Sequence, residues 1–460
     1  MSGYTGVTPA DLEHMLDVIG VASVEELFDP IPPGVRLRRP IDLPPGKPEQ
    51  EVYTELRRLA ERNVSAEDEI TFLGAGMYDH YVPSIVDMLM SRSEFLTPYT
   101  PYQPEVSQGG LQVMFEYQPA ISELTGLPVS TASVYVGPSA VGAAAYLAKL
   151  TKKRPRLLVS RGVHPHSRET LRTLAAGYGT TVEEIALDDG VTDLDALRDE
   201  LADDVGAVVL QQPNFLGAVE DVAAIATAAH EHGALVICSA DPLTLGVLEA
   251  PGKQGVDVCV GEGQSLGNRL DFGGPSFGFF AATEAHLRRM PGRIAGETTD
   301  VDGRRGFVLT LQTREQHIRR ERATSNICTS QALNALGGVV YLSWLGRQGI
   351  VEIGELMLQR THYARETLAE LDGVHKLHDQ PVVREFALRL DAPVDRVLER
   401  CAAAQINAGY ALGRYYEEYE DGLLVAITEQ RTRADIDRLA AVLGDAVAAE
   451  RSASTKVAAV

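Results

Sequence analysis

The feature that most constrains the fold is a regular alternation of short apolar runs and helical patterns between residues 157 and 260. The apolar runs occupy 157–159, 181–187, 207–210, 235–238 and 256–260, and the helical patterns occupy 167–176, 193–202 and 221–232. Strands that alternate with crossover helices build a mostly parallel sheet covered by helices. The sequence therefore predicts an α/β domain, and such domains bind ligands at the carboxyl ends of their strands.

Polar residues follow three of these runs. His164 comes after the first run, Asn214 after the third and Asp241 after the fourth. Parallel strands bring their carboxyl ends to one edge of the sheet, so these side chains are expected to converge on one crevice. A cofactor that reacts with amines would need a lysine here. Between residues 234 and 280 the only lysine is Lys253, in a Pro-Gly-Lys-Gln-Gly loop.

The segments around this region predict a domain order. Residues 1–62 form a helical arm, with helix starts at Thr8-Pro9 and at a capping box over 23–26, a connector with four prolines over 40–48, and a charged helix over 49–62. The arm either wraps a partner subunit or packs as a lid. Further helices are predicted at 83–91, 111–124, 284–290 and 331–348.

The last part of the chain has a different character. Strands are predicted at 385–390 and 422–428, and helices at 393–405 and 431–449. This order is typical of an α+β domain. We expect a large α/β domain over 63–330, a small C-terminal α+β domain over 331–450 and a flexible tail over 451–460.

Two local segments are candidates for binding. Residues 95–110 hold three prolines, two tyrosines, two glutamines and paired glycines, which excludes a helix or a central strand. The segment either lines a site or is a surface loop stiffened by proline. We favour a site, because exposed aromatic rings are costly. Ser139 is expected to cap a small-residue helix whose first N–H groups could hold a phosphate.

The charge balance excludes some partners. The net charge is −22, which argues against nucleic acid and anionic membranes. Only seven of the 42 basic residues are lysine, and such an acidic, lysine-poor surface suits a high-salt cell interior. The protein would then be less stable in dilute buffer. No run has the length of a membrane span and the N-terminus has no signal pattern, so a soluble, cytoplasmic protein is expected.

Cysteine and histidine spacing does not favour a metal site. Four widely spaced cysteines without a Cys-x-x-Cys are expected to be small buried side chains in a reducing compartment, rather than disulfides. His230 and His232 are expected at a solvated helix end, rather than as metal ligands. The glycines of 261–267 have the wrong spacing and context for a dinucleotide loop.

Longer motifs carry a resemblance to a known family. They lie at 97–110, 213–217, 261–267, 272–275 and 319–329. With these motifs the chain resembles subunit 1 of the two-chain glycine dehydrogenase (decarboxylating), the P-protein of the glycine cleavage system, from near the N-terminus to about residue 447. The resemblance implies a fold type I pyridoxal-phosphate-dependent transferase-like large domain with a smaller C-terminal α+β domain.

The same resemblance implies a cofactor site that has been lost. Asp241 matches the acid that holds the pyridinium nitrogen, and His164 matches the residue that stacks on the ring. Gln264 and Ser265 stand where the sister subunit carries a His-Lys pair. A serine hydroxyl cannot form an imine, so Asp241 and His164 are expected to be vestigial and pyridoxal phosphate to be held by the partner subunit.

The implied enzyme is a heteromer with subunit 2, expected as a dimer of heterodimers. It decarboxylates glycine and passes the aminomethyl group to the lipoyl arm of the H-protein, alongside the T-protein and L-protein. Tyr99, Tyr102, Gln103 and Gln108 are expected to reach toward the partner's site. Asn326, with arginines 319, 320 and 322, is expected at the subunit contact or the carboxylate pocket, unless the arginines only pair with the acidic surface. The alternatives are an independent pyridoxal-phosphate lyase or aminotransferase, and a scaffold that binds the H-protein.

Overall fold

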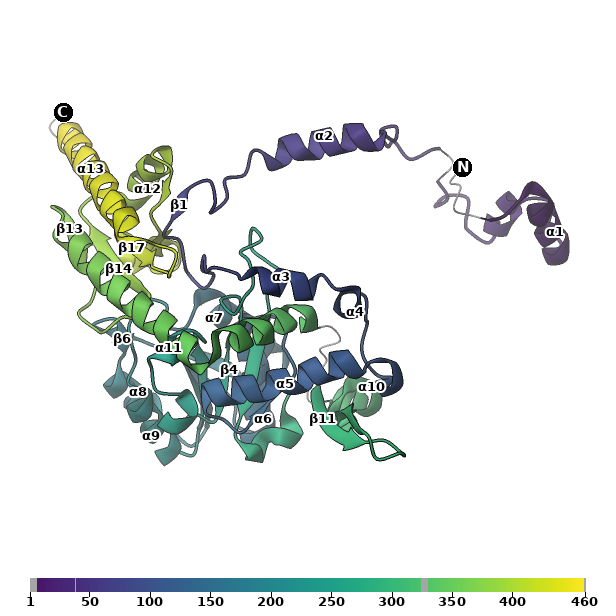
Figure 1. Ribbon diagram of the computed structural model, residues 1–460, viewed down its shortest axis with the longest axis horizontal. Coiled ribbons are helices and arrows are strands. Elements are labelled where there is room, and N and C mark those ends of the chain that lie inside the picture. The colour runs from purple at the N-terminus through teal and green to yellow at the C-terminus, as the bar shows by residue number, and fades with distance from the viewer. Residues whose placement is uncertain (1–5, 38, 324–329, 459–460) are drawn as a thin grey trace. The chain divides into compact units, whose positions relative to one another are not determined.

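The computed structural model describes residues 6–37, 39–323 and 330–458. The chain divides into two compact units, residues 1–64 and residues 65–460. Figure 1 shows both units with their labelled elements.

The first unit is helical, as predicted. Helix α1 (Pro9–Ile19) is capped by Thr8, whose Oγ1 accepts a hydrogen bond from the Asp11 N–H at 3.2 Å. Helix α2 spans Glu49–Ala60. The predicted capping box at Ser23 is wrong: the Ser23 side chain makes no cap bond before the short 3₁₀ helix η1 (Val24–Phe28), and the Glu26 carboxylate accepts from the Ala22 N–H.

No side chain of α1, η1 or α2 is buried. The hydrophobic cores of the second unit are built from residues between Phe72 and Val447. Deleting residues 1–62 therefore removes no side chain from these cores, and the remaining chain should still unfold cooperatively on heating. If the arm wraps a partner subunit, the same deletion should weaken subunit pairing in size-exclusion chromatography. An unchanged pairing affinity would favour the lid.

A seven-stranded sheet forms the centre of the second unit, in the order β2-β10-β9-β8-β7-β3-β4. Strands β4, β3, β7, β8 and β9 are parallel to one another, and β10 is antiparallel to both of its neighbours, β9 and β2. The strands are β2 (Val129–Ser130), β3 (Arg156–Ser160), β4 (Thr181–Ile185), β7 (Val205–Gln212), β8 (Leu235–Ala240), β9 (Val258–Glu262) and β10 (Gly278–Ala282). The predicted alternation from 157 to 260 is confirmed.

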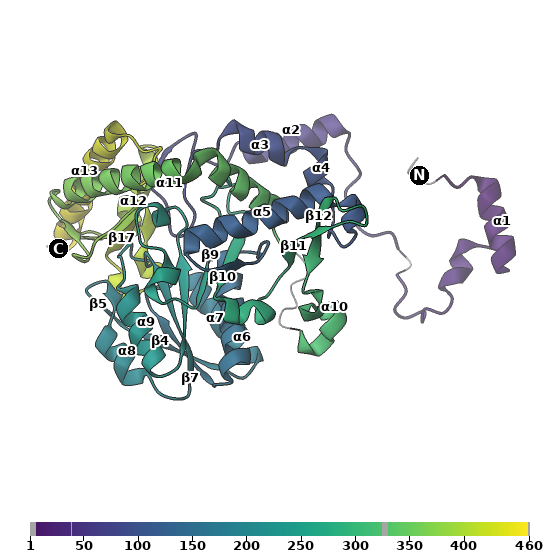
Figure 2. The same cartoon turned by 60° about the horizontal axis from the view of Figure 1, so that its bottom comes forward.

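Helices cover both faces of this sheet (Figure 2). Leu158 and Val208 point into one core with α8 and α9, while Leu157 and Ala207 point into the other core with α6 and α7. This alternation follows from the two-residue period of a strand. The helices are α6 (Gly137–Lys152), α7 (Pro165–Gly177), α8 (Leu194–Glu200) and α9 (Val222–Glu231).

The three described cysteines are small buried side chains, as predicted. Cys238, Cys259 and Cys401 are buried and free, and Cys328 lies outside the described residues. Burial raises the pKa of all three described thiols, which keeps them protonated.

Helix α11 (Ala332–Ala369) is longer than the predicted 331–348. Gly346 breaks its regular geometry with φ 63° and ψ −177°, and the helix continues beyond Gly349. Before the break, Leu336 and Tyr341 are buried in the core under the large sheet; after it, Ala364 and Leu368 are buried in the C-terminal core. A single element therefore serves both cores.

The C-terminal part contains a four-stranded antiparallel sheet in the order β13-β14-β17-β16. Its strands are β13 (Val374–Lys376), β14 (Glu385–Leu390), β16 (Tyr410–Ala411) and β17 (Gly422–Ala426), with helices α12 (Val394–Ala403) and α13 (Arg433–Ala458). The predicted strands and helices are confirmed here. Helix α13 extends into the residues that were expected to form a flexible tail.

The beginning of the second unit joins this C-terminal part. Strand β1 (Ile70–Thr71) pairs in parallel with β15 (Ile406–Asn407). Residues 74–81 then run toward the large sheet before helices α3 (Ser84–Met90) and α4 (Ser93–Leu96). Other short elements of the second unit include the β5–β6 hairpin (Leu187–Asp188, Val191–Thr192) and 3₁₀ helices η3 (Thr244–Gly246), η5 (Glu284–Arg289), η8 (Leu412–Arg414) and η9 (Glu417–Tyr419).

Candidate functional site

Asp241 lies directly after β8, at the carboxyl edge of the sheet where the sequence places it. Its Oδ2 lies 2.6 Å from Nε of Arg384, and its Oδ1 accepts a hydrogen bond from the Leu243 N–H. Arg384 comes immediately before β14, and both side chains are largely buried. The acid predicted to hold a pyridinium nitrogen is thus already paired with a cation from the C-terminal part of the same chain.

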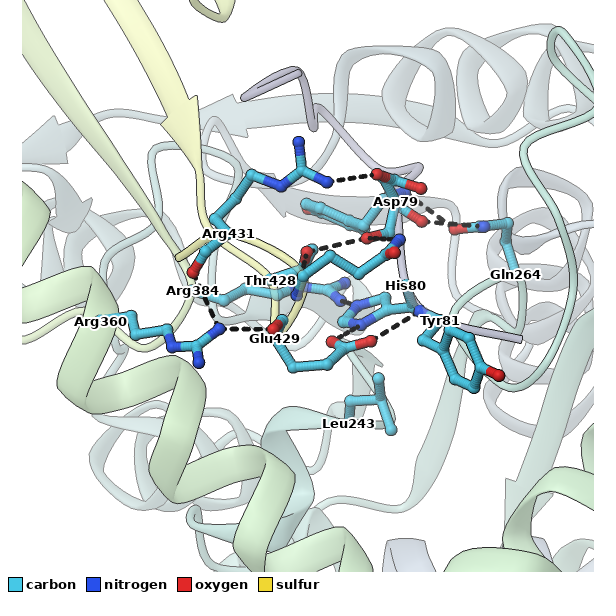
Figure 3. A network of polar contacts seen from close by, with 12 residues as sticks. Asp79, His80, Tyr81, Leu243, Gln264, Arg360, Arg384, Thr428, Glu429 and Arg431 are labelled. Carbon is cyan, nitrogen blue, oxygen red and sulfur yellow. Dashed lines mark hydrogen bonds and ion pairs between the residues drawn. The ribbon is translucent and has the colours of Figure 1, made fainter. Parts of the chain in front are cut away.

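Two further side chains, Tyr78 and His80, contact Arg384, and Glu429 holds His80 from behind; Figure 3 labels His80 and Glu429. The guanidinium carbon of Arg384 lies 3.3 Å from the centre of the Tyr78 ring. Its Nη1 lies 2.6 Å from Nε2 of His80, and Nδ1 of His80 lies 2.6 Å from Oε2 of Glu429. A guanidinium can only donate, so Nε2 of His80 accepts and its Nδ1–H donates to Glu429. We call Arg384, Asp241, Tyr78, His80 and Glu429 the Arg384 cluster.

Residues 74–81 pass through this region as a closely packed loop. Nε2 of His164 lies 2.8 Å from the backbone oxygen of Ala75, and a Cβ at Gly76, which has φ 101°, would lie only 2.9 Å from the same Nε2. The imidazole therefore packs against the chain's own backbone. Burial lowers the pKa of His164 to about 4, so the ring is neutral.

Glu385 anchors the same loop. Its Oε1 accepts from the Ala75 N–H at 2.7 Å, and its Oε2 accepts from the Tyr78 hydroxyl at 2.8 Å. Burial raises the pKa of Glu385 to about 7. Around it, Asp79 pairs with Arg431 at 2.9 Å and Arg360 donates to the Arg431 oxygen, so the loop is also held to the segment after β17 (Figure 3).

Gln264 and Ser265 are buried just after β9. The Gln264 amide accepts from the Tyr78 N–H at 2.9 Å and donates to the Tyr78 and Asn268 oxygens at 3.0 and 2.9 Å. Its side chain therefore clamps the 74–81 loop. Lys253 lies in η4 (Pro251–Gln254), before β9, where it pairs with Glu249.

A side chain of the same chain also occupies the first turn of helix α6. Oε2 of Glu262 accepts from the Gly137 N–H at 2.8 Å, and Oε1 accepts from the Ser276 hydroxyl. Burial raises the pKa of this carboxyl group. The prediction that Ser139 caps the helix from outside is wrong: the helix begins at Gly137, and Ser139 bonds back to Val136 from within the first turn.

These residues do not fit pyridoxal phosphate. The cofactor needs an acid for its ring nitrogen, an amine for its aldehyde and donors for its phosphate, such as a helix start. In this chain Asp241 is paired with Arg384, Gln264 and Ser265 offer no amine, and the start of α6 is occupied by Glu262.

The predicted loop residues form a separate group. Tyr99 is 85% exposed and Tyr102 is 46% exposed. The Tyr102 hydroxyl lies 3.3 Å from Nη2 of Arg293 and 3.4 Å from Oε2 of Glu315, and its ring meets His317 edge-on at 5.4 Å. Gln103 is exposed before the short 3₁₀ helix η2 (Pro104–Val106). The tyrosine and glutamine side chains are thus presented on the surface.

Gln108 has a structural contact that the sequence did not indicate. Its amide donates to the Phe307 oxygen at 2.9 Å and accepts from the Phe307 N–H at 2.8 Å. Phe307 lies in β12 (Arg305–Thr310), which pairs with β11 (Ile294–Thr299). Gln108 also begins α5 (Gln108–Thr125), and α4 ends at Leu96, so the prediction that 95–110 contains no helix is wrong at both ends. At the second end a helix start tolerates the glycine pair, and this clamp holds it.

The arginine group is only partly described. Arginines 319, 320 and 322 are exposed near α10 (Gln316–Arg319) and η7 (Arg320–Arg322). Arg319 donates to the Thr313 oxygen, and Arg322 lies 3.7 Å from Glu321. Asn326 lies outside the described residues.

The described residues contain neither a metal-binding cluster nor a membrane-spanning helix. No group of three or more histidine, cysteine or acidic side chains there could hold a metal ion. His230 instead pairs with Asp257 at 2.9 Å. Within the same residues, no helix combines the length and apolar character needed to cross a membrane.

Comparison with known proteins settles the family. The model of the glycine cleavage system P-protein family matches residues 2–443. The chain belongs to the glycine cleavage system P-protein family. The resemblance stated from the motifs is therefore confirmed.

Relatives within the P-protein family match almost the whole chain. A probable glycine dehydrogenase (decarboxylating) subunit 1 from Geobacillus kaustophilus is 49% identical over 442 residues, covering 96% of this chain and 98% of the relative. A protein of the same description from Moorella thermoacetica is 49% identical over 440 residues, with the same coverage. The crystal structure of an inhibitor-bound glycine decarboxylase (P-protein) is 45% identical with a TM-score of 0.89, covering 97% of this chain and all of that chain.

More distant structures define the fold. A glutamate decarboxylase from Lactobacillus brevis has a TM-score of 0.70 at 13% identity and covers 90% of this P-protein family member and 96% of its own chain. Such identities support the fold alone. The predicted fold type I architecture of pyridoxal-phosphate enzymes is confirmed.

Proposed function

We propose that this chain is subunit 1 of a two-subunit glycine dehydrogenase (decarboxylating) of the cytoplasm, and that subunit 2 holds the pyridoxal phosphate. The main support for this proposal is the identity of the two residues just after β9, Gln264 and Ser265. Gln264 and Ser265 have no amine to bond the cofactor, and Gln264 is used to hold the 74–81 loop. Family membership supplies the activity.

In this proposal the paired enzyme decarboxylates glycine and transfers the aminomethyl group to the lipoyl arm of the H-protein, with the T-protein and L-protein acting afterwards. Subunits pair one to one, as a dimer of heterodimers. This chain supports the partner's site from its surface. Tyr99, Tyr102 and Gln103 reach toward that site, Gln108 holds their loop on β12, and Asn326 with its neighbouring arginines acts at the subunit contact.

The test is to locate the cofactor. The chain is purified alone and together with subunit 2, mixed with pyridoxal phosphate, and treated with borohydride, which makes an imine to lysine permanent. Mass spectrometry of the separated subunits should find the reduced cofactor on subunit 2 only.

The other outcomes decide between the alternatives. Reduced cofactor on a lysine of this chain would overturn the proposal in favour of an independent pyridoxal-phosphate enzyme. A pair that forms the imine but does not decarboxylate glycine with lipoylated H-protein would favour a scaffold that only binds the H-protein.

The loop can be tested by Tyr102→Phe. The change removes two long hydrogen bonds, at 3.3 and 3.4 Å, so the free energy of unfolding should fall by less than about 1 kcal/mol. Turnover of the pair should fall roughly tenfold, which corresponds to about 1.4 kcal/mol of transition-state stabilisation. The measurement is the rate of CO₂ release together with the affinity between the subunits.

Tyr146→Phe, in helix α6, is the matched control, because it removes a tyrosine hydroxyl outside the loop. Its turnover should equal that of the unmodified pair. An equal turnover for Tyr102→Phe would remove Tyr102 from the proposed site, and weaker subunit pairing would assign the residue to the interface.

A further inference from the structure

Two charged side chains of this chain lie at the end of β8 and at the start of α6, two places where α/β folds hold charged ligand groups. We propose that Arg384 and Glu262 are built-in replacements for the two charged ends of a cofactor, so that the chain stabilises its own ligand-binding edge with internal groups. The inference goes beyond the proposed function, because it holds whether or not subunit 2 carries pyridoxal phosphate.

The first replacement is the cation. Asp241 lies at the carboxyl end of β8, where this architecture places ligands, and Nε of Arg384 lies 2.6 Å from its Oδ2. A protonated ring nitrogen would bring a positive charge to this acid, and the guanidinium brings the same charge. Arg384 is buried, so loss of either partner would leave an uncompensated charge.

The surroundings of Arg384 fit a permanent occupant. Tyr78 covers one face of the guanidinium at 3.3 Å, and His80 accepts from Nη1 at 2.6 Å. Both come from the 74–81 loop, which Gln264 and Glu385 hold in place. The guanidinium is therefore enclosed by an acid, an aromatic face and an acceptor.

The second replacement is the anion. Helix α6 runs for 16 residues, and its first N–H groups form a place for a negative charge. The Glu262 carboxylate accepts from the Gly137 N–H at 2.8 Å, and Ser276 donates to it. A Cβ at Gly137 would lie 3.0 Å from both Cβ and N of Glu262. The residue that carries the carboxylate is packed directly against the helix start, so the anion position is taken.

The test uses the full chain and asks whether small ions can take the place of each side chain. Arg384→Ala should lower the thermal unfolding midpoint, and methylguanidinium, at concentrations well below those that unfold proteins, should restore part of the loss. Methylguanidinium should not raise the midpoint of the unmodified chain or of the double variant Arg384→Ala, Asp241→Asn, which lacks the acid. An Arg384→Ala variant that folds and gains nothing from the ion overturns the cation assignment.

If Arg384→Ala does not fold, the comparison of Arg384→Met with the double variant Arg384→Met, Asp241→Asn decides. Removing both charges should give a higher midpoint than removing only the cation. A double variant that is no more stable than Arg384→Met overturns the assignment, because Asp241 would then not need a counter-charge.

The anion is tested in the same way. Glu262→Ala should lower the midpoint, and inorganic phosphate should raise it again. Glu262→Gln keeps the acceptor for the Gly137 N–H and is the matched control. Its midpoint should lie between those of the unmodified chain and Glu262→Ala, and it should not respond to phosphate. If phosphate changes the midpoints of the unmodified chain, Glu262→Ala and Glu262→Gln equally, the anion assignment is wrong.

Discussion

Replacing Glu385 with glutamine should raise the free energy of unfolding above neutral pH and leave it nearly unchanged in mild acid. Burial raises the pKa of this carboxyl from its ordinary 4.5 to about 7. Between these two values the unfolded chain has lost the proton and the folded chain keeps it. The stabilisation associated with the protonated form is therefore fully present below pH 4.5 and is lost as the pH rises through about 7. The loss amounts to roughly 3 kcal/mol.

Glutamine reproduces the contacts of the protonated acid. Its Oε1 can accept from the Ala75 N–H and its Nε2 can donate to the Tyr78 hydroxyl, where Glu385 now accepts. The measurement is urea unfolding from about pH 4.5 to about pH 8, and Glu417→Gln, at an exposed position, is the control. The expectation fails if the unmodified chain and Glu385→Gln lose stability in parallel as the pH rises.

Gly217→Ala should destabilise the chain by more than about 3 kcal/mol. Gly217 has φ 85°, and a Cβ there would lie 2.0 Å from the backbone oxygen of Glu385. That oxygen belongs to the first residue of β14, which is fixed by pairing with β17, so it cannot move away cheaply. The turn after β7 would have to separate from the C-terminal sheet.

The control is Gly177→Ala at the end of α7. A Cβ there meets nothing within 4 Å, and the backbone does not require a positive φ. Its free energy of unfolding should stay within about 0.5 kcal/mol of the unmodified chain or rise slightly. Equal urea midpoints for Gly217→Ala and Gly177→Ala would show that the turn can move.

The elements that sequence alone predicted are those with a local pattern. Strands β3, β7, β8 and β9 and helices α7 to α9 follow from the spacing of apolar residues between turns, because each can be recognised within about ten positions. Strand β14 was predicted for the same reason. The helix break at Gly346 was not, because a glycine that kinks a helix and one that ends it have the same local sequence.

Sequence alone located only those residues of the candidate site that follow the end of a predicted strand. Asp241, Gln264 and Ser265 follow strands, and their places are confirmed. The 74–81 loop could not be connected to its partners: Tyr78 and Glu385 are separated by 307 positions, and His80 and Glu429 by 349. Contacts over such distances leave no trace in composition or period.

Arg384 and Glu262 were missed, although each carries a weak signal. Glu262 is an acidic residue at the end of one apolar run, and Arg384 and Glu385 lie at the beginning of another apolar run. Charges at such positions are expected to be paired or to shift their pKa. The sequence therefore indicates that both need a partner, but not that the partners are Asp241 and the start of α6.

The shared helix α11 determines when this polypeptide can finish folding as it leaves the ribosome. Leu336 and Tyr341 complete the core beneath the seven-stranded sheet, whose last strand along the sequence ends at Ala282. Strand β1 can pair only after β15 (Ile406–Asn407) has been synthesised. Domains usually fold one after another from the N-terminus during synthesis. Here the nascent large half stays incomplete until most of the message has been translated. We therefore expect the growing chain to expose apolar surface of this core until helix α11 has been synthesised.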